Sequence, residues 1–424
     1  MSQILKKTNW LMWKLVFLLM LVSPLSAQTL ESFIQKALKH SPVLKGQTYK
    51  TNSSKEQYLK ESIFKKNPVL SFSYQNVPLS SWPSLDQHGM SGINLMVSQN
   101  ISFPWESSYR KDSLYNKYLS QKQKESDIKK GLIREITFVY HKLYFQYKKV
   151  EILRENKKAL GDIVKVARAL VSVNKMNSSQ LLKIEADISI IENQILQSDA
   201  KLKKAQALME KMCGISLPWQ GASAKDWMVK SSAVKVVDEL NIKQHPLYKT
   251  LSFRTKAQRA KLAYEKGKMF PGITLSGGYT LRQQVAGKDG EDFISFKASM
   301  PLPLYYPLKE KHSISAAESQ VRALREDLRN IELMLKTSWQ GEKESSKQLL
   351  KAYQNFEQEV IPKYFAAYKA QLGALSSGTV SLLDVLDAYR KYLNVSIKQA
   401  ELYRNLQISI AKLEYLSSQA KENK

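Results

Sequence analysis

The stretch LLDVLDAYR, residues 382–390, carries two aspartates, Asp384 and Asp387, three positions apart among apolar residues. Because three residues make nearly one helical turn, both carboxylates would point from one face of a helix. Such a pair could act as a general acid and base, could lie on a solvated helix surface near a helix N-terminus, or could form a ring of negative charge when copies of the chain assemble. The secondary structure predicted around the pair is needed to distinguish between these interpretations.

Other chemistry has little support in the sequence. The motif GxSxG and the phosphate-binding motifs GxGxxG and GK[ST] are absent, and the Ser-Gly-Gly of residues 276–278 lies in a strand-like segment. The five histidines lack metal-ligand spacing, and Cys213, the single cysteine, is expected to be a small buried apolar residue. We therefore predict that the protein is not an enzyme and has no metal site and no cofactor.

Residues 1–27 have the order of a secretory signal peptide, with lysines first, then LVFLLMLVS, then small residues at Ser26 and Ala27. The apolar run is short for a membrane-spanning helix, so we expect an exported chain that begins near Gln28. The formal net charge of +27 indicates an anionic partner. For an exported protein we favour anionic lipid or lipopolysaccharide over nucleic acid, although lysines that only coat solvated helices would give the same charge.

Four segments alternate apolar and polar residues with a period of two, which is typical of half-buried β-strands. They come in two pairs: VLSFSYQNV at 69–77 with GINLMVSQNIS at 92–102, and ITLSGGYTLR at 273–282 with FISFKASM at 293–300. In the last segment the polar set is Ser295, Lys297 and Ser299, together with Phe293. We therefore predict four strands in two pairs.

The two strand pairs occupy equivalent places in two copies of one pattern. Pro42 and Pro246 lie in the similar contexts HSPVLK and QHPLYK, 204 positions apart, and LLKIEA at 181–186 matches LDVLDA at 383–388 with an offset of 202. Matches at nearly one offset indicate a tandem duplication. The predicted division of the chain is a first structural repeat over 28–213, a linker over 214–242 and a second structural repeat over 243–424.

Long helices are expected after each strand pair. Apolar residues recur in steps of three and four from Ile128 to Val171 and again from Ala317 to Leu335, which favours helices that pack as coiled coils. If residues 105–173 form one helix, it is roughly 100 Å long at about 1.5 Å per residue. A compact globular domain would not need such a helix.

The strands suit a crossing of the outer membrane, with apolar residues toward lipid and polar residues toward a lumen. Four strands cannot close a barrel, and an open edge in lipid would leave backbone groups without hydrogen bonds. The barrel must therefore be shared by several chains. Three chains would give twelve strands, and the same threefold ring would pack the helices into a hollow tube.

With these features the chain resembles the outer-membrane efflux protein family, the TolC-like trimeric ducts. The resemblance is carried by NPVLSFSYQN, VSQNISFP, FPGITLSGGY, MPLPLYYPLKEKHSISAAESQ and SSGTVSLLDVLDAYRKYL. It implies an α+β, mainly α fold, with a 12-stranded transmembrane barrel shared by a homotrimer and a long periplasmic α-helical barrel. Residues 214–242 would belong to an equatorial region, and the PLPL form is more similar to ducts of heavy-metal cation efflux systems.

The resemblance implies a passive duct in the outer membrane that extends into the periplasm. Cargo, with heavy-metal cations as one candidate, would arrive from an inner-membrane pump of the RND type through a periplasmic adaptor protein of a tripartite system. Two alternatives stay open: an outer-membrane duct for type I protein secretion, and a soluble periplasmic coiled-coil scaffold. Outer-membrane lipid is an expected partner, and nucleic acid is not.

The resemblance also assigns roles to the two turns between long helices, SVNKMNSSQ at 172–180 and GALSSGTVS at 373–381, because in the family such tips meet the adaptor. The expected adaptor-contacting residues are Asn174, Met176, Asn177, Ser178, Ser377, Gly378 and Thr379. Asp384 and Asp387 are similar to acidic residues that ring a closed periplasmic entrance. Leu375 and Val380 stand where drug-efflux relatives tend to carry Tyr and Arg, so apolar contacts are an alternative means of holding this entrance closed.

Overall fold

A computed structural model describes residues 29–62, 67–86, 88–174, 176–217, 219, 239–268, 272–283, 291–376 and 379–417. The signal peptide expected over 1–27 and most of the linker expected over 214–242 lie outside the described residues. The chain divides into two compact units. The described residues of unit 1 come from Met1–Lys45, Asp127–His245 and Leu335–Lys424, and those of unit 2 from Gly46–Ser126 and Pro246–Met334.

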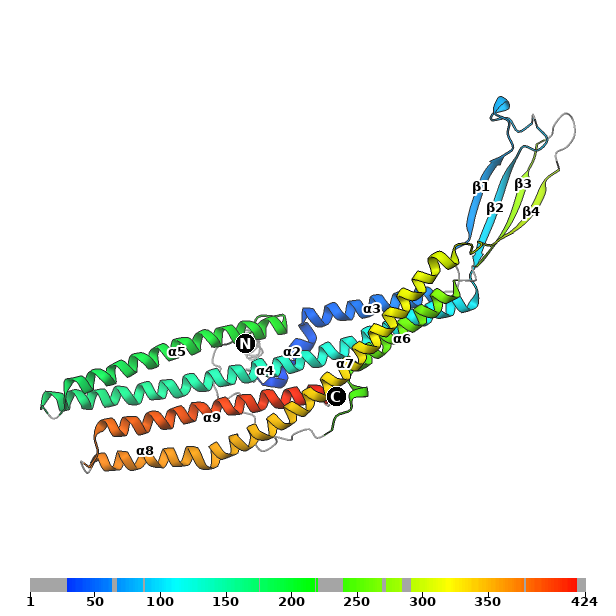
Figure 1. The fold of residues 1–424 in the computed structure, drawn as a ribbon. Helices are drawn as coiled ribbons and strands as arrows, with labels where there is room; N and C mark the ends of the chain where they lie inside the picture. The colour runs from blue at the N-terminus through cyan, green and yellow to red at the C-terminus, as the bar shows by residue number, and fades with distance from the viewer. Residues whose placement is uncertain are drawn as a thin grey trace, which may run out of the picture. The chain divides into compact units, whose positions relative to one another are not determined.

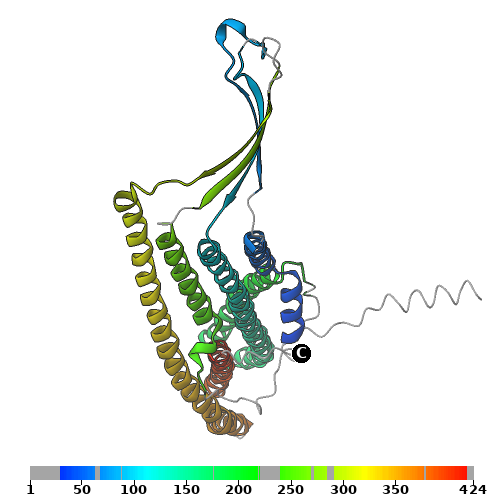
Figure 2. The same cartoon turned by 90° about the vertical axis from the view of Figure 1, so that its right-hand side faces the viewer.

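Unit 2 contains one antiparallel sheet with the strand order β1-β2-β3-β4 (Figure 1). The strands are β1 (Val69–Gln75), β2 (Gly92–Ile101), β3 (Ile273–Leu281) and β4 (Phe293–Ser299), and they coincide with the four predicted segments to within two residues. Strands β2 and β3 pair with each other, so the strand pairs from the two halves of the sequence form one sheet. Figure 2 shows the sheet twisting along its length. Strands β1 and β4 are its two edges.

One face of the sheet is apolar. Phe72 of β1 lies opposite Leu95 of β2, Leu95 lies opposite Tyr279 of β3, and Tyr279 lies opposite Ile294 of β4. This row crosses the whole sheet, and its side chains are exposed, from 44% for Tyr279 to 70% for Ile294. A monomeric soluble protein rarely leaves such a surface uncovered, so lipid or protein must cover it.

The opposite face is polar and internally hydrogen-bonded. Three side-chain pairs join β2 to β3 on it: Asn94 donates to Thr280 Oγ1 at 2.7 Å, Asn100 to Thr274 Oγ1 at 3.0 Å, and Ser98 to Ser276 Oγ at 2.9 Å. Polar side chains that hydrogen-bond to one another in this way can line a water-filled space. The alternation predicted from the sequence therefore produces two chemically different surfaces on one sheet.

Helices precede and follow each strand pair. The preceding helices are α3 (Pro42–Ser62) and α6 (Pro246–Gly267), and the following helices are α4 (Pro104–Ser172) and α7 (Tyr306–Asn355). Helix α4 has 69 residues, which confirms the single long helix predicted over 105–173. Within unit 2, Ser113 and Ser120 of α4 donate to carbonyl oxygens of α6 at 2.9 and 2.8 Å, so small side chains let these helices approach closely.

Unit 1 is helical in the part that the structure describes. Besides the remaining lengths of α4 and α7, it contains α2 (Leu30–His40), α5 (Ser178–Cys213), α8 (Ile361–Ser376) and α9 (Leu382–Leu416). A π-helical turn at Phe356–Val360 separates α7 from α8, so the second predicted helical stretch is interrupted where α4 is continuous. The apolar residues of unit 1 form two clusters. One includes Phe33, Leu143 and Met209, and the other includes Leu160, Ile184 and Leu386.

Gly214 fixes the end of α5 beside the start of α3. Its φ of 68° is in the left-handed region, and a Cβ atom there would lie 2.8 Å from the carbonyl oxygen of His40 and 2.9 Å from Cδ of Pro42. The preceding Cys213 is fully buried, with Sγ 3.8 Å from the carbonyl oxygen of Phe33. Cys213 therefore packs as the small buried apolar residue that the sequence predicts.

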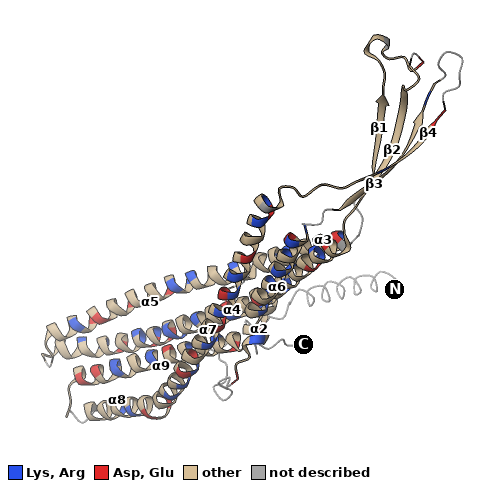
Figure 3. Ribbon diagram, turned by 45° about the vertical axis from the view of Figure 1, so that its right-hand side comes forward, with Lys and Arg blue, Asp and Glu red and all other residues tan. Residues whose placement is uncertain are grey.

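The charged residues lie mainly on the helices. Figure 3 shows Lys, Arg, Asp and Glu distributed along the helices, whereas the strands carry very little charge. Among the residues that the structure describes, no helix combines the length and the hydropathy that crossing a membrane requires.

Candidate functional site

The first predicted tip is the short turn between α4 and α5. Asn174 has a φ of 55°, a left-handed conformation that Asn tolerates better than most side chains. Asn177 is the N-cap of α5, and its side chain accepts a hydrogen bond from the backbone N–H of Ser179 at 2.9 Å. Asn174, Asn177 and Ser178 are exposed, whereas Met176 is half-buried against the apolar cluster around Leu160. Three of the four predicted contact residues are therefore accessible at this tip.

The second predicted tip lies between α8 and α9. Thr379 closes the end of α8, because its backbone N–H and its hydroxyl donate to the carbonyl oxygen of Ala374 at 3.1 and 3.0 Å. Thr379 is exposed. The predicted contact residues Ser377 and Gly378 lie outside the described residues.

Asp384 has a defined local role at the start of α9. Its Oδ2 accepts hydrogen bonds from the hydroxyl of Ser381 at 2.6 Å and from the backbone N–H of Ser381 at 3.0 Å, while its own backbone N–H donates to Ser381 Oγ at 3.2 Å. This is a capping box. The hydrogen bonds from the Ser381 hydroxyl and backbone lower the pKa of the Asp384 carboxyl, so its side chain is ionised at neutral pH.

Asp387 lies almost one turn further along α9, and its Oδ2 is 2.7 Å from Nζ of Lys391. Both side chains of this pair are more than half exposed, so it contributes little to stability. The hydrogen bond and charge of Asp387 raise the pKa of the Lys391 ammonium. The structure thus brings Asp384 and Asp387 to one exposed surface of α9 and gives each of them a partner within the chain.

Apolar residues beneath the two aspartates attach α9 to its neighbours. Val385 and Leu386 are 2% and 0% exposed, and Leu386 belongs to the same cluster as Ile184 of α5 and Leu160 of α4. Ile184 and Leu386 are equivalent positions of the two sequence repeats. The apolar seam predicted around Asp384 and Asp387 therefore exists, and it leaves the carboxylates on the outside.

Ion pairs that the sequence did not predict surround this seam. Arg390 of α9 pairs with Asp187 of α5. Glu185, the first-repeat counterpart of Asp387, pairs with Arg168 of α4 at 2.8 Å. Arg390 is the last residue of LLDVLDAYR, but nothing in the linear sequence identifies Asp187 as its partner. Only the fold brings α5 and α9 together.

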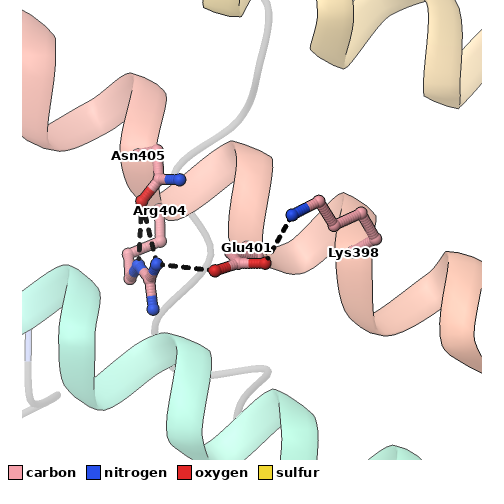
Figure 4. Close-up of polar contacts among 4 residues, drawn as sticks. All are labelled: Lys398, Glu401, Arg404 and Asn405. Atoms are coloured by element: carbon pink, nitrogen blue, oxygen red, sulfur yellow. Dashed lines mark hydrogen bonds and ion pairs between the residues drawn. The ribbon is translucent and has the colours of Figure 1, made fainter.

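Aromatic and cationic contacts hold α9 along the rest of its length. Tyr389 lies 4.9 Å from Tyr368 of α8 between ring centroids, and burial raises the pKa of the Tyr389 hydroxyl to about 12. Further along, Figure 4 shows Arg404 bonded to Asn405 and to Glu401, which also pairs with Lys398. The Arg404 guanidinium lies 4.4 Å from the centre of the Phe145 ring of α4. Helix α9 is thus held to both α8 and α4.

The chemistry of these tips suits contact with another surface. The exposed groups are amides, hydroxyls and carboxylates that are held in place by helix caps and ion pairs. In the described ranges no cluster of three or more His, Cys, Asp or Glu side chains is arranged to hold a metal ion.

Comparisons with known proteins agree with this fold. Residues 242–417 match the family model described as outer membrane efflux protein. The chain is similar to the solved structure of CusC, with 15% identity over 92% of each chain and a TM-score of 0.77. It is also similar to the outer-membrane channel OprN, with 14% identity over 91% of this chain and 89% of that chain and a TM-score of 0.78.

A third similar structure is the open state of the MtrE outer membrane channel of Neisseria gonorrhoeae, with 15% identity over 91% of this chain and 88% of that one and a TM-score of 0.76. No curated protein sequence matches the chain. The structural likenesses establish a TolC-like fold across nine-tenths of the chain, and the family model covers most of the second half. Residues 242–417 therefore resemble the outer membrane efflux protein family, and the chain has the fold of the outer-membrane channels OprN and MtrE.

Proposed function

We propose that three copies of this chain form a passive duct through the outer membrane and that the duct is the last component of a tripartite efflux system. An inner-membrane pump, of the RND type by resemblance, would deliver cargo through a periplasmic adaptor protein. The duct itself needs no catalytic group, because energy and most of the cargo selection would belong to the pump. Heavy-metal cations are one candidate cargo, and the sequence resemblance is the support for them.

The observation that carries the proposal is the four-stranded sheet with two open edges and two different faces. Backbone groups along the outer edges of β1 and β4 need partners in a membrane, because lipid offers none. Pairing β4 of one copy with β1 of the next satisfies both edges, and three copies give a closed barrel of twelve strands. The apolar row through Leu95 and Tyr279 would face lipid, and the polar row through Ser98 and Ser276 would face the lumen.

The helix tips are proposed as the adaptor-binding surface. Asn174, Asn177, Ser178 and Thr379 are exposed and offer hydrogen-bonding groups, and Met176 supports the turn from the apolar side. Next to the first tip, Val173 and Leu182 are 59% and 64% exposed, so this surface offers apolar as well as polar groups to a partner. Ser377 and Gly378 remain proposed contacts on the sequence resemblance alone.

The entrance is proposed to carry a ring of negative charge from Asp384 and Asp387. In a trimer each aspartate occurs three times around one axis, and the three copies attract cations to a narrow opening. Lys391 neutralises much of the charge of Asp387, since the two groups form an ion pair at 2.7 Å. Asp384 is hydrogen-bonded to uncharged Ser381 groups and is therefore expected to supply most of the net charge of the ring.

Disulfide trapping tests the shared barrel. A Ser73→Cys change in β1 combined with Ser295→Cys in β4 places thiols on both edge strands, and shifting the β1 cysteine to Ser71 or Gln75 scans the register. Oxidation should give covalent trimers in outer-membrane fractions. The control pairs Ser98→Cys of the inner strand β2 with Ser295→Cys, and it should stay monomeric. If every cysteine pair of the scan gave only monomers after oxidation, the shared barrel would be contradicted. Recovery of the chain from the soluble periplasm without detergent would likewise contradict the duct and favour a coiled-coil scaffold.

Cargo is tested separately in a deletion strain. Sensitivity to divalent metals, detergents and antibiotics should be compared in parallel, together with the proteins secreted into the medium. Raised metal sensitivity alone supports metal efflux. Loss of a secreted protein with unchanged sensitivities would point to type I protein secretion through the same architecture.

A further inference from the structure

Lys297 is the one charged residue in the four strands of the sheet. Strands β1, β2 and β3 contain no Asp, Glu, Lys or Arg, and β4 contains Lys297 alone. A charged group in a membrane-spanning segment is costly and is retained where it faces protein or water. The face of the sheet that carries Lys297 is therefore expected to face protein or water.

The register places Lys297 on the polar face. It lies directly opposite Ser276 of β3, and Ser276 is hydrogen-bonded to Ser98 of β2 at 2.9 Å. Its neighbours in β4, Phe296 and Ala298, belong to the other face, where Phe296 is 88% exposed. A lysine on the lipid side near the middle of the membrane would cost about 2–4 kcal/mol, so the face that carries Lys297 is the one suited to a lumen.

The barrel wall offers this ammonium group no counter-charge. Lys297 is exposed, and the described strands contain no carboxylate, so strands contributed by other copies of the chain would contain none either. The nearest acid on the N-terminal side of β4 is Asp292, five residues away, which is about 16 Å along a strand. Asp292 already accepts hydrogen bonds from the Tyr279 hydroxyl at 2.6 Å and from the backbone N–H of Arg282 at 3.0 Å.

We propose that Lys297 from three copies forms a cationic ring in the lumen of the shared barrel and that this ring biases the pore toward anions. The inference rests on the proposed trimeric duct. Rings of basic side chains select for anions, as rings of acidic side chains select for cations. The ring has the opposite sign to the one proposed at the entrance, so a free multivalent cation attracted by Asp384 would be repelled at Lys297. Cargo that is neutral, anionic or bound in an anionic complex would pass more easily.

The expected size of the effect is modest because the lumen is wet. Three charges about 10 Å from a permeating ion in water, screened at about 0.1 M salt, change the concentration of each ion roughly twofold, in opposite directions for cation and anion. The ratio of cation to anion permeability therefore changes roughly fivefold. Reversing the charge should change the ratio roughly 20-fold. Both effects should disappear near 1 M salt, where the Debye length falls to about 3 Å.

Reversal potentials of the full-length channel in planar bilayers under a KCl gradient test the ring. Lys297→Gln should raise the permeability ratio of K⁺ to Cl⁻ about fivefold, Lys297→Glu about 20-fold, and Lys297→Arg should leave it unchanged. Lys204→Gln, which removes an exposed lysine of α5, is the control for loss of a charge outside the strands. Conducting Lys297→Glu channels with the reversal potential of the unmodified chain would overturn the ring. Absence of conductance in the unmodified chain would instead overturn the duct.

A cysteine variant keeps the test independent of folding differences between mutants. Cys213, the single native cysteine, is fully buried, so Lys297→Cys introduces the accessible thiol among the described residues. On the same assembled channel, a methanethiosulfonate reagent that carries an ammonium group restores the positive charge, and one that carries a sulfonate reverses it. The two reagents should shift the reversal potential in opposite directions. Equal potentials before and after both reactions would contradict a lumenal position for Lys297.

Discussion

Arg390 of α9 forms an ion pair with Asp187 of α5, and this contact joins the helices that follow the two tips. The two helices also share the apolar cluster that contains Leu386 and Ile184, which are both fully buried. The side chains of the pair are 37% and 26% exposed, so solvent screens the charges only in part. The apolar seam and the ion pair together hold α9 against α5, so polar and apolar contacts both contribute near the proposed entrance.

Replacing Arg390 with Ala should loosen α9 at the entrance. The change leaves the Asp187 carboxylate partly buried without its cation, and loss of such a contact costs on the order of 1 kcal/mol. We expect a higher single-channel conductance or a larger open fraction in planar bilayers. Arg390→Lys should restore most of the closed behaviour.

Arg168→Ala is the matched control, because the Arg168 pair with Glu185 joins α4 to α5 and does not involve α9. It removes an equal charge from the same region of the molecule. If both variants changed conductance equally, the effect would come from charge and not from the link between α5 and α9.

Asp384 should be the stronger of the two entrance aspartates. Replacing it with Asn removes the charge but keeps an oxygen that can accept the Ser381 hydrogen bonds, so the helix start is preserved while cation attraction falls. We expect Asp384→Asn to weaken block by divalent cations more than Asp387→Asn, since Asp387 is paired with Lys391. The double change of both residues to Ala should raise conductance or weaken block further. Unchanged block in all three variants would return both residues to the solvated-surface interpretation.

Gly214 should tolerate no side chain. Gly214→Ala combines a left-handed φ of 68° with a Cβ atom 2.8 Å from the carbonyl oxygen of His40, so we expect a loss of roughly 1–3 kcal/mol in the free energy of unfolding. Gly161→Ala is the control, because Gly161 lies inside α4 with no atom within 4 Å of an added Cβ. That change should be neutral or stabilise by about 0.5–1 kcal/mol. Thermal unfolding of the two variants in detergent gives the comparison, and equal midpoints would contradict the close approach at Gly214.

The sequence predicted what depends on local pattern. The alternation of residues such as Phe72 and Ser73 gave the strands and their faces, because the period of two is a property of one strand. The apolar steps of α4 gave a single helix of 69 residues. The Arg390 pair with Asp187 was not predicted, because it joins residues 203 positions apart whose side chains meet only when α5 and α9 pack. The capping box at Asp384 depends on a local pattern, because Ser381 lies three residues earlier. The repeat and the family resemblance instead favour a charged ring.

His141 should make the folded chain sensitive to acid. Its side chain is 1% exposed among aromatic rings, 5.4 Å from Tyr140 and 6.0 Å from Tyr403 between centroids. Burial lowers the pKa of His141 from 6.5 to about 4. Between these values the unfolded chain binds a proton that the folded chain does not. Stability from this group is therefore complete above pH 6.5 and decreases as the pH falls toward 4, by up to about 3 kcal/mol.

His141→Phe keeps an aromatic ring without a titrating group and should reduce the loss of stability between pH 7 and pH 4.5. Thermal midpoints of the detergent-solubilised chain at the two pH values measure the difference. His312→Asn removes an exposed histidine of α7 and should leave the pH dependence as it is. An unchanged slope in His141→Phe would mean that groups other than His141 set the acid sensitivity.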